Sequence, residues 1–304
     1  MPEIVSLNCV LVVVNYGSHQ LIEKNLRRLP SDSDRLHVVI VDNFSTQSER
    51  RALRDLCERM GWELVESPGN LGFGGGVNLG VQRALDFTPQ TIVLLNPDAV
   101  IDQPALEGLG TLVGEDPNRL VCPRIEDTTG SVFFAGALLD MKTGMTLGIG
   151  SPHRREGAEY RQWFTGACLA FAPELWERLG GFDDDYFLYW EDIDLSFRAE
   201  QAGAQLYYAP DILVVHDEGG TQQSGGSRAK SGLYYYYNIR NRMLFARKWL
   251  PRSVRWRWIV SALPASWNIV LRGGRRQLLQ SFTPWKSLAR GVLDGWKDVR
   301  GARI

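Results

Sequence analysis

Cysteine and long apolar runs are both scarce in this chain, and each scarcity argues against a class of protein. The 304 residues contain four cysteines, which lie far apart at Cys9, Cys57, Cys122 and Cys168. They form no CxxC pair and no metal-ligand spacing, so we expect no disulfide framework and favour a reducing compartment. The longest apolar stretch near the C-terminus, Ile259–Leu271, contains a proline and is too short to cross a bilayer as a helix.

Two common phosphate-binding motifs are also missing. The glycine-rich run Asn70–Asn78 does not fit G-x-G-x-x-G, because Val77 stands where the last glycine should be. A G-x-x-x-x-G-K-[ST] loop does not occur either. These absences argue against a dinucleotide-binding oxidoreductase and a P-loop NTPase. The glycines could still let backbone N–H groups and a helix N-terminus approach a phosphate or a sugar.

The net charge of −1 conceals an uneven distribution of charge along the chain. Residues 247–304 carry 13 Lys/Arg against 2 Asp/Glu, a net charge of +11, whereas residues 1–246 carry −12. The same C-terminal segment holds six of the ten tryptophans. Basic charge together with interfacial aromatic residues indicates contact with an anionic membrane surface or with nucleic acid.

Apolar patterns in the first hundred residues predict an α/β fold. Short apolar runs alternate there with helical stripes, and the predicted strands are Val10–Val14, Val38–Val41, Trp62–Val65 and Thr91–Leu95. This alternation predicts a mostly parallel sheet that is covered by helices on both faces.

The middle of the chain is more irregular. Four further strands are predicted at Phe133–Leu139, Trp163–Phe171, Gln205–Tyr208 and Ile212–Val215. Helices are predicted at Pro173–Leu179, Glu191–Ala202 and Tyr234–Leu250. The Gly/Ser-rich segment Gly219–Ser227 is a candidate flexible loop.

Polar residues follow four of the predicted strands. They are Asn15, Asp42-Asn43, Asn96-Pro97-Asp98 and His216-Asp217. Ligands of open α/β sheets bind beyond the carboxyl ends of the strands, so this convergence predicts an active site. Asp98 and His216 could hold Mg²⁺ or Mn²⁺ together with substrate phosphate oxygens. The alternatives are that Asp98 caps the helix near Pro104, that His216 is structural, and that Asp42 forms an Asx-turn.

A second cluster of acids begins a helix. Six carboxylates lie within the twelve residues 183–194, among aromatic side chains. Carboxylates surrounded by aromatic residues are candidates for a raised pKa and for general-base catalysis. The alternative is that Glu191, Asp192 and Asp194 only complement the helix dipole.

Together these segments resemble the family 2 inverting glycosyltransferases of the GT-A fold, particularly their rhamnosyltransferase-like branch. The resemblance covers about residues 8–245 and rests on motifs in the same order and spacing. They are Val13-Val14-Asn15-Tyr16, Val41-Asp42-Asn43, the glycine run 70–80, Leu95-Asn96-Pro97-Asp98-Ala99, the segment 180–198, His216, and Tyr237 with Arg240-Asn241.

The resemblance implies a GT-A catalytic domain at residues 1–246 and a basic, Trp-rich helical extension at residues 247–304. It implies Asp192 as general base, beside Glu191, and a metal site for Mg²⁺ or Mn²⁺ at Asp98 and His216. Asp98 stands where the family's DXD motif ends, and only one carboxylate is available there. The implied donor-binding residues are Asn15, Asp42, Asn43, Gly72, Asn78, Asn96, Asp98 and Arg240, and the acceptor-side residues are Gly166, Trp190 and Asp194.

The implied function is metal-dependent, inverting transfer of a sugar from a nucleotide-diphosphate donor, such as dTDP-rhamnose. The acceptor would be lipid-linked or a polysaccharide, in bacterial cell-surface glycan synthesis. The C-terminal segment would hold the protein at the inner face of the plasma membrane, in the cytoplasm, and no nucleic acid is expected as a partner. Alternatively, its helices pack on the catalytic domain or form a homodimer interface.

Two other functions stay open from the sequence. A sugar nucleotidyltransferase would need a basic phosphate loop after the first strand, and Asn15-Tyr16-Gly17-Ser18 has no basic residue. A non-catalytic protein could instead bind membrane or nucleic acid through its C-terminal segment.

Overall fold

The computed structural model describes residues 8–29, 36–216 and 230–303, and its largest element is a nine-stranded sheet. The strands lie in the order β3 (Glu63–Glu66), β2 (Leu36–Asp42), β1 (Cys9–Asn15), β4 (Thr91–Leu95), β11 (Cys168–Phe171), β6 (Arg119–Asp127), β12 (Gln205–His216) and β5 (Ala99–Val100). A further strand, β7 (Val132–Phe134), pairs with β6. The predicted loop Gly219–Ser227 lies outside the described residues.

The direction of the strands decides which side chains can meet. β1 pairs in parallel with β2 and β4, β2 with β3, and β6 with β12. β11 is antiparallel to both β4 and β6, so these two strands run in the same direction. The carboxyl ends of β1–β4, β6 and β12 therefore lie at one edge of the sheet, and β11 begins at that edge.

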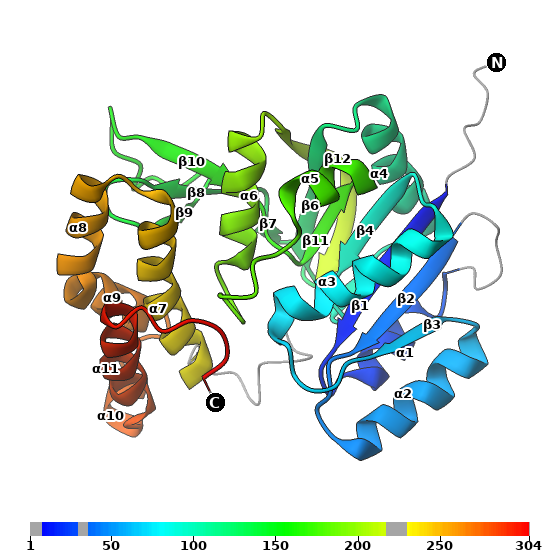
Figure 1. Cartoon of the computed structure of the whole chain (residues 1–304), viewed down its shortest axis with the longest axis horizontal. Coiled ribbons are helices and arrows are strands. Elements are labelled where there is room, and N and C mark those ends of the chain that lie inside the picture. The colour runs from blue at the N-terminus through cyan, green and yellow to red at the C-terminus, as the bar shows by residue number, and fades with distance from the viewer. Residues whose placement is uncertain (1–7, 30–35, 217–229, 304) are drawn as a thin grey trace.

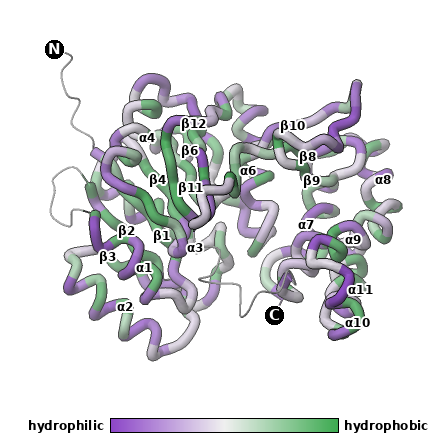
Figure 2. The backbone as a smooth tube through the Cα atoms, turned by 180° about the vertical axis from the view of Figure 1, so that it is seen from behind, coloured by the Kyte–Doolittle hydropathy of each residue, from purple (hydrophilic) through white to green (hydrophobic). Residues whose placement is uncertain are grey.

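Helices cover both faces of the sheet, as the alternation of strands and helices predicts (Figure 1). One face packs against α1 (His19–Leu26), α2 (Gln47–Met60) and α4 (Gln103–Glu115), and the other against α3 (Gly72–Ala84), α5 (Pro173–Leu179) and α6 (Glu191–Gln201). On β1, Leu11 and Val13 join the first core, whereas Val10 and Val12 join the second. Figure 2 shows these strands as apolar segments between helices of mixed hydropathy. A short 3₁₀ turn, η1 (Leu85–Phe87), follows α3.

Four predicted strands are corrected by the structure. The segment 133–139 is divided at Gly136 into β7 and β8 (Ala137–Asp140), and 163–171 is divided at Gly166 into β10 (Tyr160–Trp163) and β11. β8 and β10 form a separate three-stranded sheet with β9 (Thr146–Gly148). The two predicted strands at 205–208 and 212–215 are one strand, β12, which bulges after Ala209.

The central strand β6 has no counterpart among the predicted elements. Its sequence contains Pro123, which lacks an N–H group and is normally excluded from the middle of a sheet. Pro123 pairs with Ala209 where the register of β12 shifts, so the missing donor falls at an irregularity of the ladder.

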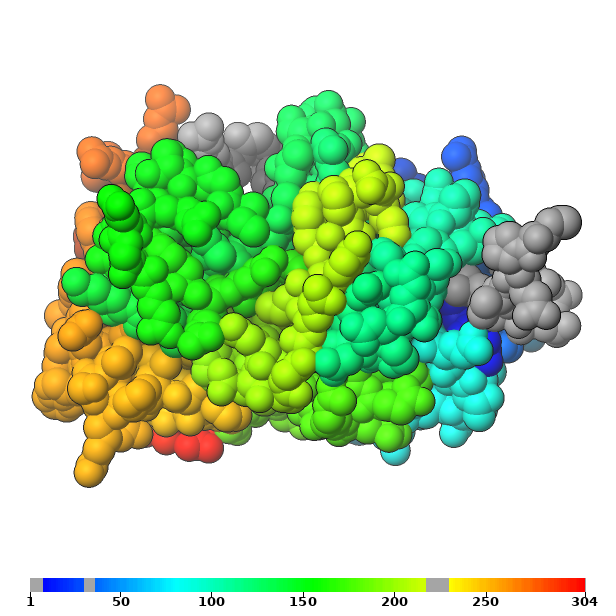
Figure 3. All heavy atoms as spheres, turned by 90° about the horizontal axis from the view of Figure 1, so that it is seen from above, coloured from blue at the N-terminus to red at the C-terminus, as the bar shows by residue number. Residues whose placement is uncertain are grey.

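Helices α7 (Gly232–Trp249), α8 (Arg252–Val260), α9 (Ala262–Leu271), α10 (Gln277–Gln280) and α11 (Thr283–Trp296) form the C-terminal extension. They lie at one end of the molecule, which is yellow to red in Figures 1 and 3. The predicted boundary between residues 246 and 247 falls inside α7. The extension also contacts α6 directly, because Phe197 packs against Phe245 and Trp249, and Trp190 just before α6 packs against Trp258.

The extension therefore packs on the part of the chain that precedes it, which is one of the alternatives predicted for its role. Within the described ranges, no helix is long and apolar enough to span a membrane.

The glycine-rich run is helical rather than a loop, because α3 begins at Gly72. A Cβ atom on Gly80 would lie 2.6 Å from Val12 Cγ1 and 2.7 Å from Val41 Cγ2. A Cβ atom on Gly76 would lie 2.8 Å from Val14 Cγ1. These glycines are needed because α3 packs closely on β1 and β2.

We predict that Gly80→Ala lowers the midpoint of urea unfolding. Overpacking costs about 1–3 kcal/mol, more than the ~1 kcal/mol that alanine gains over glycine in a helix. The matched control is Gly114→Ala near the end of α4, where no atom lies within 4 Å of the added methyl group and the midpoint should rise. Equal shifts of the two midpoints would contradict the close packing of α3.

Candidate active site

Asp98 and His216 meet at the edge where the strands end. His216 is the last residue of β12 and pairs with Ala99 of β5, and its Nε2 lies 3.1 Å from Asp98 Oδ1. Both side chains are buried, and the Phe133 ring stacks on the imidazole with a centroid distance of 4.7 Å. Asp102, not Asp98, caps the next helix, because its carboxylate accepts the Ala105 N–H at 2.9 Å. Capping of that helix is therefore excluded as the role of Asp98.

The pair Asp98–His216 fits a divalent cation. His216 Nε2 and Asp98 Oδ1 face each other at 3.1 Å, so a neutral imidazole and a carboxylate bring one nitrogen and one oxygen donor to the same place. Mg²⁺ and Mn²⁺ are often bound by one or two protein ligands plus phosphate oxygens and water. No group of three His, Cys, Asp or Glu side chains suitable for a metal occurs among the described residues. Asp217 lies outside them.

Asp42 ends β2 and is fully buried. Arg50 of α2 forms an ion pair with Oδ2 of Asp42 and donates from Nη2 to the Ser67 carbonyl at 2.7 Å. Oδ1 of Asp42 is buried and has no hydrogen-bond partner among the described residues, so it makes no Asx-turn bond there. A buried acceptor without a partner is costly, and an N–H group of a ligand would satisfy it.

Two asparagines shape the neighbouring turns. Asn15 accepts the Ser18 N–H at 2.9 Å and donates to Glu49 at 3.1 Å, beside a cavity of about 480 Å³ that residues 17–21, Lys24 and Glu49 line. Asn43 accepts the Leu71 N–H and donates to the Gly72 carbonyl. Asn43 therefore ties the end of β2 to the beginning of α3.

The turn before β11 connects the Asp98 side of the site with the Asp192 side. The Asn96 N–H donates to the Ala167 carbonyl at 2.9 Å, and the Gly166 N–H donates to Asp192 Oδ2 at 3.4 Å. A Cβ atom on Gly166 would lie 2.7 Å from the Phe73 ring, so a side chain does not fit there. The Asn-Pro-Asp turn, Gly166 and Asp192 are thus successive neighbours.

Glu191 and Asp192 begin α6 in a buried setting. Burial raises the pKa of Asp192 to about 6, although the N–H groups of Ile193 and Gly166 oppose this shift by donating to its carboxylate. Burial and the neighbouring charge of Asp192 raise the pKa of Glu191 well above its usual range. Asp192 is half-buried, whereas Glu191 is buried. At neutral pH Asp192 is therefore mostly ionised, and Glu191 keeps its proton to a higher pH than an ordinary glutamate does.

The segment before α6 is strained. Phe187, Tyr189 and Trp190 have positive φ angles of 62°, 63° and 77°, a region that side-chain-bearing residues rarely adopt. Asn241 Nδ2 lies within hydrogen-bond distance of the carbonyls of Tyr186, Leu188 and Tyr189, at 2.7–3.1 Å. Such strain persists where the surroundings over-determine the backbone, and it is common at functional sites.

The comparison with known proteins decides the family. Residues 10–171, more than half of the chain, match the profile of glycosyl transferase family 2. The chain is a family 2 glycosyltransferase. It is 24% identical over 250 residues to the low-salt glycan biosynthesis hexosyltransferase Agl10 of Haloferax volcanii, covering 80% of this chain and 77% of that protein.

A second relative places the glycosyltransferase near the rhamnosyltransferases. This chain is 26% identical over 231 residues to the N-acetylglucosaminyl-diphospho-decaprenol L-rhamnosyltransferase of Mycobacterium tuberculosis. The alignment covers 68% of this chain and 75% of that protein. A mannosyltransferase from Pyrobaculum calidifontis, solved with GDP-Man and Mn²⁺, has the same fold, with a TM-score of 0.57 and 18% identity. The alignment covers 98% of this chain and 90% of that one, and the fold is the expected GT-A fold.

Several predicted site residues of the glycosyltransferase have structural contacts instead. Asp194 is fully buried and accepts from Tyr186, Arg198 and Trp249, and Trp190 is buried against the extension. Arg240 is fully buried and donates to the carbonyls of Gly301, Asp185 and Tyr186. These contacts occupy the polar groups of Asp194 and Arg240, so the structure does not place them with the edge residues.

Asn78 and Gly72 also serve the packing of α3. Asn78 accepts the Phe182 N–H and donates to the Phe182 carbonyl and to Asp184. A Cβ atom on Gly72 would lie 2.1 Å from the Phe187 carbonyl oxygen. The N–H groups of Leu71, Gly72 and Phe73 all donate to protein acceptors, so these three groups are not available to a phosphate.

The sequence analysis missed Glu49 and Arg50, which support Asn15 and Asp42. A signal was present, because Thr46 and Glu49 have the spacing of a helix capping box. Thr46 does cap α2 and accepts the Glu49 N–H, and this start of the helix turns Arg50 toward the end of β2. The Glu49 carboxylate does not reach back to the cap but accepts from His19 and Asn15.

We predict that Arg50→Met lowers the free energy of unfolding by about 3 kcal/mol, because it leaves the fully buried Asp42 without its cation. The measurement is urea unfolding at neutral pH. The matched control is Arg54→Met on the same helix, whose exposed ion pair with Glu66 should contribute little. If both variants unfold at the same urea concentration, the buried pair does not stabilise this edge.

Proposed function

We propose that the protein is a metal-dependent, inverting glycosyltransferase that transfers a sugar from a nucleotide-diphosphate donor to a glycan acceptor. The observation that carries this proposal is the arrangement at one edge of the sheet. Asp98 and His216 lie at one side, and the Gly166 turn connects them to Asp192, an ionised carboxylate of raised pKa. The edge would thus provide a cation site for the donor and a general base for the acceptor.

The donor would bind at the ends of β1, β2 and β4. Asp42 Oδ1 is the buried acceptor for an N–H group of the nucleoside, and Asn15, Asn43 and Asn96 shape the turns around it. Asp98 and His216 would hold Mg²⁺ or Mn²⁺, as the Mn²⁺ complex of the mannosyltransferase neighbour supports. A bound divalent cation supplies positive charge that stabilises the leaving diphosphate.

Asp192 would act as general base on the acceptor. Its carboxylate takes the proton of an acceptor hydroxyl group as the hydroxyl oxygen bonds to the anomeric carbon of the sugar. The bond between that carbon and the diphosphate oxygen breaks on the opposite face, so the configuration inverts and the nucleoside diphosphate leaves. Glu191 is buried beside Asp192, and its raised pKa disfavours a second negative charge next to the base.

The donor sugar and the acceptor are proposed from the relatives. The name of the mycobacterial relative, a rhamnosyltransferase acting on a diphospho-decaprenol, supports rhamnose, from dTDP-rhamnose, and a polyprenyl-linked acceptor. A lipid-linked acceptor would place the enzyme at the cytoplasmic face of the plasma membrane, in cell-surface glycan synthesis.

We predict that Asp192→Asn lowers kcat by about 10²–10⁴-fold, because it removes the general base. The dissociation constant for the nucleoside diphosphate should not change. Glu191→Gln is the matched control, since the amide has nearly the shape of the carboxyl group and keeps the buried position uncharged, so kcat should change little. Equal losses of kcat in the two variants would show that Glu191 and Asp192 have a structural role, or that the role of general base is assigned to the wrong one of them.

The pH profile of the wild type tests the same assignment. A base with a pKa of about 6 is ionised above that pH and protonated below it. We therefore expect kcat to be level near neutral pH and to fall by about tenfold per unit below pH ~6. The residual kcat of Asp192→Asn should not show this fall at low pH. If the fall persists in the variant, it is caused by the protonation of another group.

Thermal unfolding with nucleoside diphosphates, with and without Mn²⁺, tests the donor site. A ligand that binds only the folded state raises Tm, and Mn²⁺ should increase the shift. Asp98→Asn should abolish the Mn²⁺-dependent part and keep the rest, whereas Asp55→Asn, an exposed control on α2, should keep both. The absence of any shift in the wild type would overturn the proposed donor site.

A further inference from the structure

Exposed apolar side chains are concentrated in the C-terminal extension. Of the eighteen large apolar side chains that are exposed among the described residues, ten lie at or after Trp249. Nine of these define what we call the C-terminal apolar face: Trp256, Val260, Leu263, Trp267, Leu279, Phe282, Trp285, Leu293 and Trp296. Leu279 is 93% exposed and Phe282 is 88% exposed. Soluble proteins rarely leave large contiguous apolar surfaces in water without a function.

These side chains belong to adjacent helices. Trp256 and Val260 are one helical turn apart on α8, as are Leu263 and Trp267 on α9. α11 lies alongside, because the rings of Trp267 and Trp285 are 5.6 Å apart and Trp296 Nε1 donates to the Ile259 carbonyl at 3.2 Å. Seven of the nine side chains thus lie on the neighbouring helices α8, α9 and α11, Leu279 lies on α10, and Phe282 directly precedes α11.

The folding of the extension does not require this face. α11 packs on α7 through its opposite side, where Gly291 and Gly295 contact Ile239 and Met243 and where Val292 is buried. Trp285 and Trp296 each satisfy the indole N–H with a backbone carbonyl and leave the ring nearly half exposed. A ring that is anchored by its polar end and open at its apolar body suits the interface between membrane and water.

The apolar face is accompanied by cations that have no acidic partner. Arg252, Arg257, Arg275, Arg276 and Lys286 are exposed, and none of them forms an ion pair within the described residues. By contrast, Arg300 pairs with Asp185 and Asp298. In the sequence the unpaired cations lie among the apolar residues of the face. Lys286, for example, directly follows Trp285.

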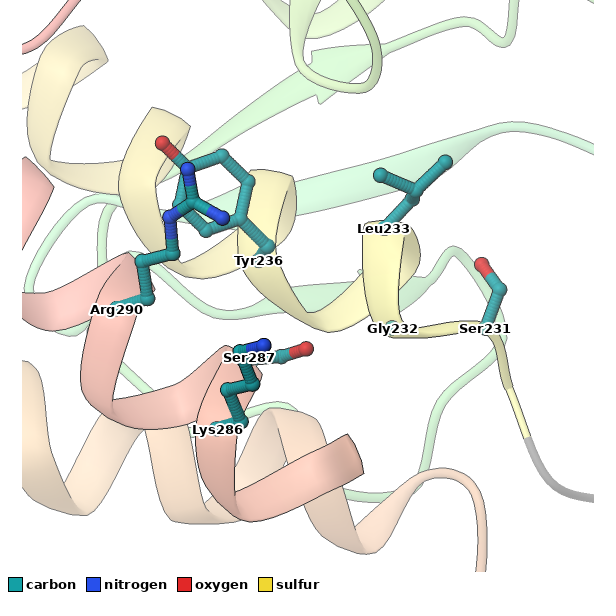
Figure 4. A pocket seen from close by; sticks show the side chains of 7 residues that line it. All are labelled: Ser231, Gly232, Leu233, Tyr236, Lys286, Ser287 and Arg290. Carbon is teal, nitrogen blue, oxygen red and sulfur yellow. The ribbon is translucent and has the colours of Figure 1, made fainter. Parts of the chain in front are cut away.

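A cavity of about 280 Å³ adds to this pattern at the junction of α7 and α11 (Figure 4). Ser231, Gly232, Leu233 and Tyr236 of the α7 side and Lys286, Ser287 and Arg290 of α11 line it. Figure 4 shows that the two basic side chains come from the same helix. The chemistry of this lining, two cations and three hydroxyl groups beside apolar walls, matches a phosphate group at the boundary of an apolar phase.

We propose that the C-terminal apolar face docks on an anionic lipid bilayer, with its aromatic and aliphatic side chains in the interface and its unpaired cations on lipid phosphates. The charge complementarity favours a bilayer over a second copy of this chain, since two such faces would bring like charges together. Aliphatic Leu263, Leu279 and Leu293 favour it over nucleic acid, which offers phosphates but little apolar surface. The inference does not depend on the donor or the metal proposed above.

The test is sedimentation of the full-length protein with vesicles of phosphatidylcholine, with and without phosphatidylglycerol. The wild type should bind the anionic vesicles and bind the neutral ones far more weakly. Leu279→Ser/Phe282→Ser should lower the partition coefficient at least tenfold. Arg275→Gln/Arg276→Gln should lower it by about fivefold per residue at low salt and less at high salt.

Matched controls come from positions outside the C-terminal apolar face. Ile149→Ser/Leu213→Ser removes two exposed apolar side chains, and Arg27→Gln/Arg28→Gln removes two adjacent exposed arginines. Both should bind vesicles like the wild type. The urea midpoint and the nucleotide-induced Tm shift of every variant should be unchanged, which separates loss of docking from loss of fold or of the donor site.

Three results would overturn the proposal. In the first, the wild type does not bind anionic vesicles. In the second, Leu279→Ser/Phe282→Ser binds them as well as the wild type does. Alternatively, sedimentation velocity without lipid would show a dimer that the same two substitutions dissociate. That last result would assign the face to an interface between two copies of this chain.

Discussion

The strained backbone of residues 187–190 is the constraint on which the active-site edge depends. Three residues with side chains hold left-handed conformations there, each at a cost of order 1–3 kcal/mol. Asn241 holds the carbonyls of this segment from α7, and the Phe73 N–H of α3 donates to the Phe187 carbonyl from the other side. Because α6 begins directly afterwards, these contacts decide where Glu191 and Asp192 lie.

The C-terminal extension belongs to this support. Arg240 links the Tyr186 carbonyl to Gly301 near the end of the chain, and Lys248 forms ion pairs with Asp183 and Asp185. The extension thus has an inner side that fixes the segment before the base and an outer side that water or a partner can reach. Its basic charge is divided in the same way, between buried or paired residues inside and unpaired ones outside.

The acidic residues of the 183–194 cluster fall into two groups, those that form ion pairs and those that do not. Asp183 and Asp185 pair with Lys248, and Asp194 pairs with Arg198, so these carboxylates are compensated. Glu191 is buried and Asp192 is half-buried, neither forms an ion pair within the described residues, and the loss of solvent therefore raises the pKa of both. Composition predicted a cluster of acids with raised pKa, but only the contacts identify which two of them have it.

The sequence by itself determined the α/β architecture, the edge at which Asp42 and His216 end their strands and Asp98 follows its strand, and the uneven charge, because periodicity and strand ends are local properties. It did not determine β6, with its internal proline, or the roles of Arg240, Asn78 and Asp194. Those depend on partners 50 to more than 100 residues away, such as Phe182 for Asn78. Only the tertiary structure decided them, since a polar side chain serves packing or chemistry according to which groups the fold brings to it.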